Sequence, residues 1–377
     1  MSQVYELMKY LLIVFSRVVY IFCRPFSPFF DRDFNLKPKK ILVLYNQIIK
    51  IGDSILITPV IDALRKAYPS AFIAVMVTPI NEPIFKNNPK LDKVIVSKYY
   101  HFKKLFCPLE YRRLKKENFD LIVNLYFSLP SNLLAFLSSP KYTVGFDLNG
   151  SGFCINKKVK FLGPKRRVRH EIEYYLDVVR ALGVKCKITK PSIFTSPEQK
   201  KWAKNFLKEH NISKNKILVG IHPSAAFEQR EWPKERFVAV MEMLMKKYDL
   251  NFLFFDDLEK ESDQVVVVKN KSLNEFLALI EQCDLFICND SGPMHMAVSL
   301  GVPVVAIFGP QTPVKYGPLG EGHTTIYKNF SCSPCNQLFF QECKPINGKP
   351  PCLHSIKTEE VFRAAEAQIK KLMRKHS

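Results

Sequence analysis

The sequence has no short-period repeat and no low-complexity tract, and acidic residues are scarce beside basic ones. Only 35 aspartates and glutamates stand against 56 lysines and arginines, which leaves a formal net charge of +21. This excess indicates a polyanionic partner, and nucleic acid, an anionic membrane surface and a phosphorylated substrate all qualify. Charged residues at 24% and apolar residues at 47% of 377 exclude a protein with many membrane spans. The length suits two globular domains.

The N-terminal segment has neither the cleavage site of a secretory signal peptide nor an uninterrupted apolar run. Lys9 and Arg17 interrupt the otherwise apolar YELMKYLLIVFSRVVYIFCRPFSPFF, whereas a spanning helix needs roughly 20 nearly uninterrupted apolar residues. We therefore expect residues 1–36 to form an arm that lies on the membrane surface. A true span by residues 5–23, or a buried arm, is the alternative. Without a secretion signal, the body of the protein is expected in the cytoplasm.

Basic residues cluster together with aromatic ones in one part of the chain. Residues 98–116 mix tyrosine and phenylalanine with lysine and arginine, and the cluster KRRVRH follows at 165–170. Such a mixture suits a lipid headgroup interface, where rings lie at the boundary and cations meet phosphates. It would also stack on RNA bases, or form a solvated basic face.

The cysteines indicate a reduced protein with one cluster. Four of the ten lie close together, at Cys332, Cys335, Cys343 and Cys352. A C-x-x-C pair followed by two further cysteines fits structural zinc, but the second pair is widely spaced and lacks its own C-x-x-C. A loop of reduced or disulfide-bonded cysteines is the alternative.

Apolar runs of strand length alternate with helical patterns twice, on either side of a charged, proline-containing segment at 183–200. The predicted strands are Ile41–Tyr45, Phe72–Val77, Lys93–Val96, Leu121–Asn124, Ile217–Ile221, Phe252–Phe255, Leu285–Cys288 and Val304–Phe308. The predicted helices are Ser54–Tyr68, Leu133–Leu137, Glu171–Leu182, Pro197–Glu209, Lys234–Lys247, Leu273–Glu281, Met294–Leu300 and Thr358–Arg374. This alternation predicts two doubly wound α/β domains. Ligands bind such sheets outside the carboxyl ends of the strands, so the site is expected in a central cleft that both sheets face.

The first loop with chemical interest, residues 46–59, follows the first predicted strand. Gly52 allows a tight turn there, and Asp53 and Ser54 open a helix. Asp53 is either a plain N-cap or a functional carboxylate, and this stretch alone leaves both open.

The second and third loops carry features that suit phosphate binding. None of the three loops contains the G-x-G-x-x-G motif or a P-loop. Nicotinamide-dependent and kinase-type activities therefore lose their main support. In the second loop, residues 222–237, the small residues 224–226 allow close approach of a ligand, and Arg230 supplies a planar cation. In the third loop, residues 290–295, a helix begins directly after a strand and directs free N–H groups at an anion. Trp232 is expected to pack in the core.

Together and in this order, IGDSILITPVIDALRKAYPSAFIAVMV, GIHPSAAFEQREWPKERF and NDSGPMHMAVSLGVPVVAIFGPQTPVKYGP resemble glycosyltransferase family 9, the heptosyltransferases of lipopolysaccharide core assembly. The resemblance covers roughly residues 40–370. It implies the GT-B fold, with an acceptor-binding Rossmann-like domain at 37–190 and a nucleotide-sugar-binding one at 191–377 that includes the cysteine loop 332–352. It also implies an inverting transferase without a cofactor or an active-site metal. ADP-heptose would be the donor, and a lipid-linked anionic oligosaccharide (lipid A–core) at the inner membrane would be the acceptor, with no nucleic-acid partner.

The resemblance also assigns roles to individual residues. It makes Asp53 the general base on the acceptor hydroxyl, with Lys50 and Gly52 on the acceptor side. The donor-binding residues that it implies are Ser224, Arg230, Asp257, Asp290, Ser291 and Gly292. Within this set, Arg230 faces the diphosphate, the 290–292 turn takes the phosphate at a helix N-terminus, and Asp257 or Glu259 contacts the ribose. This chain departs from the family pattern in FFDDLEKES, which has no glycine, and at Asn46 and Gln47, where many members have arginine.

Two other functions compete with this interpretation. A GT-B enzyme that uses a UDP-sugar on another cell-envelope acceptor would share the same loops. A basic nucleic-acid-binding protein would explain the charge of +21, but neither Asp53 after a strand nor the phosphate-binding third loop. Retention on bulk RNA without nucleotide-sugar binding would favour it.

Overall fold

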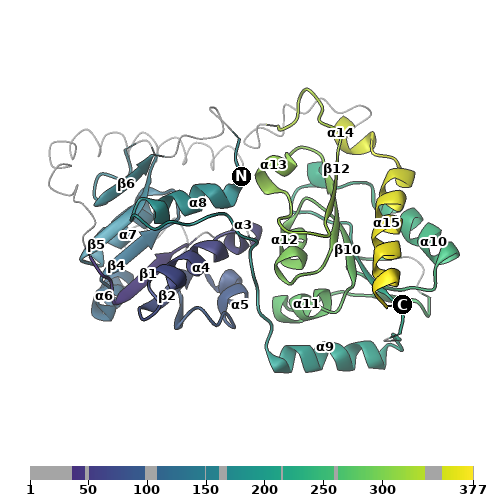
Figure 1. Ribbon diagram of the computed structural model, residues 1–377, viewed down its shortest axis with the longest axis horizontal. Helices are drawn as coiled ribbons and strands as arrows, with labels where there is room; N and C mark the ends of the chain where they lie inside the picture. Colours follow the sequence, from purple (N-terminus) through teal and green to yellow (C-terminus); the bar gives the residue numbers. More distant parts are fainter. Residues whose placement is uncertain are drawn as a thin grey trace. The chain divides into compact units, whose positions relative to one another are not determined.

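The computed structural model describes residues 36–46, 51–97, 108–148, 150–160, 168–213, 215–258, 262–335 and 350–376 (Figure 1). The predicted arm, apart from its last residue, lies outside these ranges, as do residues 98–107, Lys50, Glu259 and Cys343. Within the described ranges, no helix combines the length and the apolar character that a membrane crossing requires.

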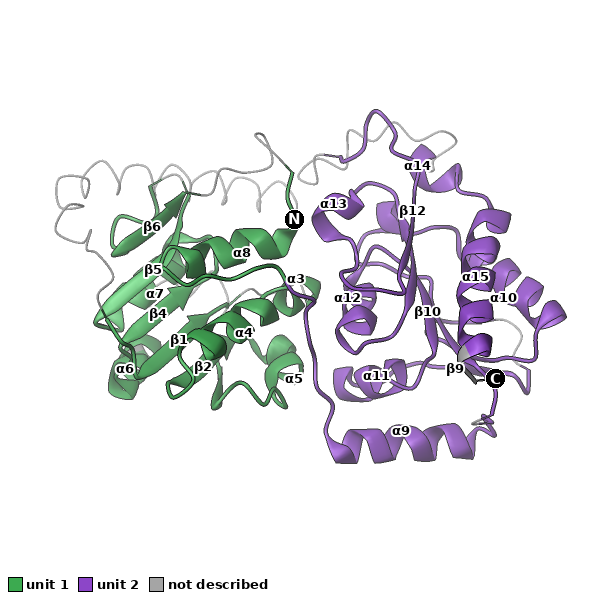
Figure 2. Cartoon of the chain, viewed as in Figure 1, with its two compact units in different colours: residues 1–188 green, residues 189–377 purple. Residues whose placement is uncertain are grey.

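The chain divides into two compact units, residues 1–188 and residues 189–377 (Figure 2). Each unit contains one six-stranded sheet in which every named pair of neighbouring strands is parallel. Helices lie in most of the connections between consecutive strands, as is usual in a parallel sheet. The predicted α/β class with two doubly wound domains is thereby confirmed.

The sheet of the first unit has the order β3-β2-β1-β4-β5-β6. Its strands are β1 (Lys40–Leu44), β2 (Phe72–Val77), β3 (Lys93–Val96), β4 (Leu121–Asn124), β5 (Tyr142–Asp147) and β6 (Lys157–Lys160). Its helices are α3 (Ile51–Ile55), α4 (Thr58–Ala67), α5 (Glu82–Phe85), α6 (Pro108–Glu117), α7 (Leu129–Leu137) and α8 (Glu171–Arg180), with a 3₁₀ turn at Pro79–Asn81. The central strand β1 has fully buried residues from Ile41 to Leu44, which is why it reads as one apolar run.

The second unit repeats this plan with the order β12-β11-β10-β7-β8-β9. Its strands are β7 (Leu218–His222), β8 (Asn251–Phe254), β9 (Val265–Val267), β10 (Leu285–Asn289), β11 (Val304–Phe308) and β12 (Thr324–Tyr327). Its helices are α9 (Pro197–Glu209), α10 (Lys234–Lys247), α11 (Leu273–Ile280), α12 (Gly292–Ser299), α13 (Pro313–Tyr316), α14 (Pro351–His354) and α15 (Thr358–His376), with a 3₁₀ turn at Glu228–Arg230. The C-terminal helix α15 packs along α10 (Figure 1).

The strand order determines where ligands can bind within each unit. Strand order reverses between β1 and β4 in the first sheet and between β7 and β10 in the second. At such a switch point the connecting helices leave toward opposite faces of the sheet, and a crevice opens at the carboxyl ends of the strands. The first loop follows β1, the second loop follows β7, and the third loop follows β10. All three loops therefore lie at switch points.

The structure differs from the predicted elements in several respects, and the helices α5, α6, α13 and α14 are among the elements that were not predicted. The helix predicted over Ser54–Tyr68 is two helices, α3 and α4, because Pro59 lacks an N–H and is accommodated only in the first turn of a new helix. The strands β5, β6, β9 and β12 were not predicted either. Strand β6 contains three lysines among four residues, a composition that protects a sheet edge but gives no apolar signal.

Candidate active site

Side-chain hydrogen bonds join the second loop to the end of β10. The Trp232 backbone N–H donates to Asn289 Oδ1 over 3.0 Å, and Asn289 Nδ2 donates to the Pro223 carbonyl. Trp232 is fully buried, and its indole N–H donates to the Ile356 carbonyl over 3.0 Å, so it is the core residue that the sequence predicted. These hydrogen bonds hold the second loop against the end of β10, where the third loop begins.

Arg230 of the second loop and Asp290 of the third loop form an ion pair where the two loops adjoin. The distance from Arg230 Nη1 to Asp290 Oδ2 is 3.7 Å, and the side chains are 17% and 3% exposed. Arg230 Nε is buried and has no hydrogen-bond partner among the described residues. The Asp290 carboxylate therefore orients a guanidinium that keeps donor capacity for a ligand.

The start of α12 has the properties of an anion site. Ser291 is the N-cap residue in an extended conformation, but its side chain does not cap the helix. Its hydroxyl instead donates to the Asn289 carbonyl over 3.3 Å. Since no side chain from the N-cap occupies the first N–H groups, from Gly292 onward, these groups and the positive end of the helix dipole remain suited to a phosphate. His295 lies in the same helix and is 6% exposed.

A polar cluster follows β8 next to the second loop. The Ser224 hydroxyl donates to the Asp256 carboxylate, and Lys234 Nζ lies 2.9 Å from Asp256 Oδ1. Burial acts to raise the pKa of Asp256, but the hydrogen bond from Ser224 and the ion pair with Lys234 outweigh it and leave the pKa below its usual value. Asp256 is therefore a charged carboxylate at the switch point.

The structure places Asp257, the predicted donor residue, differently. Its side chain is 77% exposed and forms an ion pair with Lys269. Of the two aspartates, Asp256 is the one that contacts Ser224. The sequence-based prediction missed Asp256 and Lys234. Asp256 could have been chosen because it lies one residue closer than Asp257 to the carboxyl end of β8.

His222, the last residue of β7, also lies beside this cluster. Burial lowers the pKa of His222 to about 4, although the negative charge of Asp256 acts in the opposite direction. Its ring stands edge-to-face with Phe276 at a centroid distance of 5.8 Å. His222 is therefore a neutral imidazole at neutral pH, and nothing in the sequence singles it out.

In the first unit, Gly52 and Asp53 both lie within α3, so Gly52 is a helical residue and not the tight turn that the sequence predicted. Asp53 is half-buried and is the third residue of α3, not the N-cap of a helix that begins at Ser54. Its negative charge acts on two buried tyrosines of the same unit, Tyr45 and Tyr175. Burial and, next, the charge of Asp53 raise the pKa of Tyr45 well above its usual value, and burial likewise raises the pKa of Tyr175.

No group of three or more His, Cys, Asp or Glu side chains in the described ranges is arranged to hold a metal ion. Of the cysteine cluster, Cys332 is exposed, Cys335 is half-buried and Cys352 is buried. Cys343, the remaining candidate zinc ligand, lies outside the described residues.

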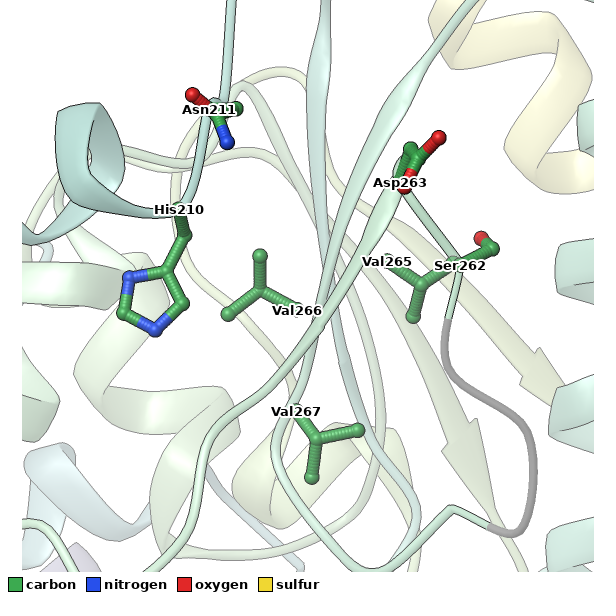
Figure 3. A pocket seen from close by; sticks show the side chains of 7 residues that line it. All are labelled: His210, Asn211, Ser262, Asp263, Val265, Val266 and Val267. Carbon is green, nitrogen blue, oxygen red and sulfur yellow. The ribbon is translucent and has the colours of Figure 1, made fainter.

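One pocket of about 420 Å³ runs along edge strand β9 in the second unit (Figure 3). It is lined by His210, Asn211, Ser262, Asp263, Val265, Val266 and Val267. None of the predicted site residues is among them, so this pocket is separate from the switch point.

Comparison with known proteins identifies the family. The model of glycosyltransferase family 9 (heptosyltransferase) matches residues 110–342. The chain belongs to this family. It is 23% identical over 338 residues to lipooligosaccharide heptosyltransferase 2 of Campylobacter jejuni, an alignment that covers 85% of this chain and 96% of that protein.

Solved structures of similar proteins agree with this family 9 assignment. A family 9 glycosyltransferase from Veillonella parvula superposes with a TM-score of 0.77 at 26% identity and covers 90% of this chain and 99% of its own. The ADP-heptose lipopolysaccharide heptosyltransferase II of Escherichia coli has a TM-score of 0.70 at 19% identity and covers 89% and 99%. The fold is GT-B, as expected, and the chain is a glycosyltransferase.

Proposed function

We propose that this enzyme transfers heptose from ADP-heptose to the inner core of a lipopolysaccharide, with inversion at the anomeric carbon. The observation that carries the proposal is the ion pair of Arg230 with Asp290, just before the start of α12, a helix that its own N-cap side chain does not cap. Its curated relatives include lipopolysaccharide and lipooligosaccharide heptosyltransferases, which favours heptose and this acceptor over other sugars.

The second unit would bind the donor. Arg230 and the first N–H groups of α12 would stabilise the charge that develops on the departing diphosphate, which is the main task of such a site. Because these groups supply a cation and fixed donors, we propose that the reaction needs no metal. We assign ribose contact to Asp256 in preference to the exposed Asp257, since Asp256 is anchored to Ser224 and Lys234.

Asp53 of the first unit would act on the acceptor. An ionised carboxylate accepts the proton of the acceptor hydroxyl while the oxygen attacks the anomeric carbon. The bond from that carbon to the diphosphate oxygen breaks on the opposite face, so the product has the inverted configuration. Gly52, and Lys50 beyond the described residues, would lie on the acceptor side. The basic stretches and the N-terminal arm would hold the enzyme at the cytoplasmic face of the inner membrane, where the lipid-linked acceptor lies.

The donor is tested by a thermal-shift screen across ADP-heptose and UDP-, GDP- and CDP-sugars. A ligand at 100 times its Kd stabilises by about 2.7 kcal/mol, which raises the Tm of a domain of this size by about 5 to 10 °C. We expect ADP-heptose to give the largest shift. The largest shift with a UDP-sugar would contradict the donor assignment.

The reaction is tested with ADP-heptose and heptose-deficient lipopolysaccharide as acceptor, with and without EDTA. We expect ADP release and the addition of one heptose, by mass, at similar rates in both conditions. NMR of the product should show the anomeric configuration opposite to that of the donor. Retention of configuration would exclude single displacement, and a loss of activity in EDTA would exclude metal independence. Binding to RNA without any nucleotide-sugar shift would contradict the enzyme function as a whole.

A further inference from the structure

Two buried asparagine side chains lie at the carboxyl end of the first sheet, and no step of the proposed reaction uses them. Asn124 is the last residue of β4, Asn132 lies in α7, and both are 0% exposed. The β4 loop, residues 125–128, joins the two elements. Asn124 Nδ2 donates to Asn132 Oδ1 over 2.7 Å. A buried amide costs free energy unless its polar atoms are hydrogen-bonded, so apolar residues would be the simpler core at both positions.

The two amides fix the segments that follow β4 and β5. Asn124 Oδ1 accepts hydrogen bonds from the Ser131 hydroxyl over 2.7 Å and from the Tyr126 backbone N–H over 3.2 Å. Asn132 Nδ2 donates to the Ser151 carbonyl over 2.9 Å. A buried polar network is rigid when its members have their hydrogen-bond partners. The β4 loop is therefore held in one conformation and tied to the turn that follows β5.

Gly145 of β5 leaves space for this pair. Strand β5 lies beside β4 in the sheet, and Gly145 is the register partner of Asn124. A side chain added at Gly145 would bring its Cβ to 3.1 Å from the Asn124 Cβ, which is closer than ordinary van der Waals contact. The glycine therefore belongs to the same arrangement as the two amides.

The β4 loop carries two aromatic rings at the switch point between β1 and β4. Residues 121–125 are buried, whereas Tyr126 and Phe127 are half-buried. The Phe127 ring stacks on Phe146 of β5 at a centroid distance of 4.1 Å. The Tyr126 ring stands edge-to-face on the ring of Tyr45, which follows β1, at a centroid distance of 6.1 Å. Each ring is thus packed against the sheet's own aromatic residues and still keeps an exposed part at the end of the sheet where ligands bind.

We propose that Tyr126 and Phe127 contact a sugar ring of the acceptor, and that Asn124 and Asn132 are positioning residues that hold the β4 loop for this contact. A fixed aromatic side chain offers a large contact area at low cost in conformational entropy, and its apolar face suits the C–H face of a sugar. This inference rests on the proposed assignment of the acceptor to the first unit.

The test measures kcat and the KM of each substrate, ADP-heptose and de-acylated, heptose-deficient lipopolysaccharide, for wild type and three variants. Tyr126→Ala and Phe127→Ala each remove a contact, and Asn124→Ala releases the loop that carries both rings. In all three, the KM for the acceptor should rise by about 10-fold, the scale of one lost stacking contact. The KM for ADP-heptose should stay within about twofold of wild type, because the second unit binds the donor and its ground-state contacts are unchanged.

Thr143→Val is the matched control, because Thr143 forms a polar pair near the opposite, amino end of β5. Thr143 is 3% exposed, and its hydroxyl donates to Asn156 Oδ1 over 2.8 Å. Valine has nearly the same shape, so this variant should lower the Tm and leave both KM values unchanged. Ser131→Ala removes one hydrogen bond to Asn124 and is the milder variant if Asn124→Ala does not fold. It should raise the acceptor KM in the same direction, but less.

A double variant that combines Asn124→Ala with Tyr126→Ala shows whether the amides act through the loop. If they do, its acceptor KM should match that of the more affected single variant, because residues that act as a unit are not additive. Fully additive effects, or an Asn124→Ala variant that changes only the Tm, would refute the positioning role. An unchanged acceptor KM in Tyr126→Ala and Phe127→Ala, while wild type transfers heptose, would refute the contact. No transfer to this acceptor by wild type would overturn the proposed function itself.

Discussion

Arg230→Ala is the substitution that tests the donor site most directly. The guanidinium is 17% exposed, forms its ion pair with Asp290 over 3.7 Å, and has a buried Nε without a hydrogen-bond partner among the described residues. If it contacts the donor diphosphate, its loss removes a charge-assisted hydrogen bond worth about 1.5 to 3 kcal/mol. Since each 1.4 kcal/mol is tenfold in affinity, ADP should bind roughly 10- to 150-fold more weakly.

The assay compares ADP with adenosine by calorimetry at one fixed salt concentration. Adenosine lacks the phosphates, so its affinity should change by less than about twofold. Arg236→Ala is the matched control, because Arg236 lies in the first turn of α10 and donates to the carbonyls of His354 and Ile356 over 2.8 and 2.7 Å. It should lower the Tm and leave the ratio of ADP to adenosine affinity unchanged. Equal weakening of both ligands by Arg230→Ala would show that Arg230 does not contact phosphate.

Three further predictions follow from the same structure. Asp53→Asn should keep the Tm close to wild type and lower turnover by about 100-fold or more, as circular dichroism and ADP release would measure; normal turnover would remove Asp53 from catalysis. The lowered pKa of Asp256 means that its carboxylate stabilises the fold above about pH 4 and that this contribution is lost as the pH falls through the lowered pKa. The Tm difference between wild type and Asp256→Asn should therefore shrink between about pH 6 and pH 3, and a constant difference would contradict the ion pair with Lys234. Deletion of residues 1–30 should move the enzyme from the membrane to the soluble fraction and retain transfer to a de-acylated acceptor, whereas a failure to fold would make the arm part of the core.

The fold could be predicted in outline because parallel strands buried on both faces leave a strong local signal. Residues 41–44 and 304–308 are continuous apolar runs, and the structure buries every one of them. The helices between such runs have their own periodicity and caps, such as the capping box at Ser196 that begins α9. Two rounds of this alternation were enough to specify two doubly wound sheets and to place the three loops at carboxyl ends. Strands at the sheet edges, such as β6 and β9, were missed because edge strands are often short or rich in charged residues, which prevents pairing with other chains. They therefore lack the long apolar run that predicts a buried strand.

The candidate site could be predicted only where its chemistry is local. Ser291 and Gly292 are recognisable because a turn and a helix start lie next to each other in the chain. The ion pair between Arg230 and Asp290 joins the loop after β7 to the loop after β10. The two loops meet because β7 and β10 are neighbours in the sheet, which the sequence does not show. The choice of Asp256 over Asp257 depends on the path of the backbone after β8, which brings the Asp256 carboxylate to Ser224 and leaves the Asp257 side chain exposed.

The sequence by itself determined the class of fold, the position of the loops and the family resemblance, because each of these depends on local patterns of residues along the chain. Only the tertiary structure decided which side chains meet. Tyr45 and Tyr175 are 130 residues apart and each reads as an ordinary core residue, yet the packing of α8 beside the end of β1 brings their hydroxyls to 3.4 Å. Contacts of this kind depend on the order in which strands and helices assemble around the core, and no spacing along the chain encodes that order directly.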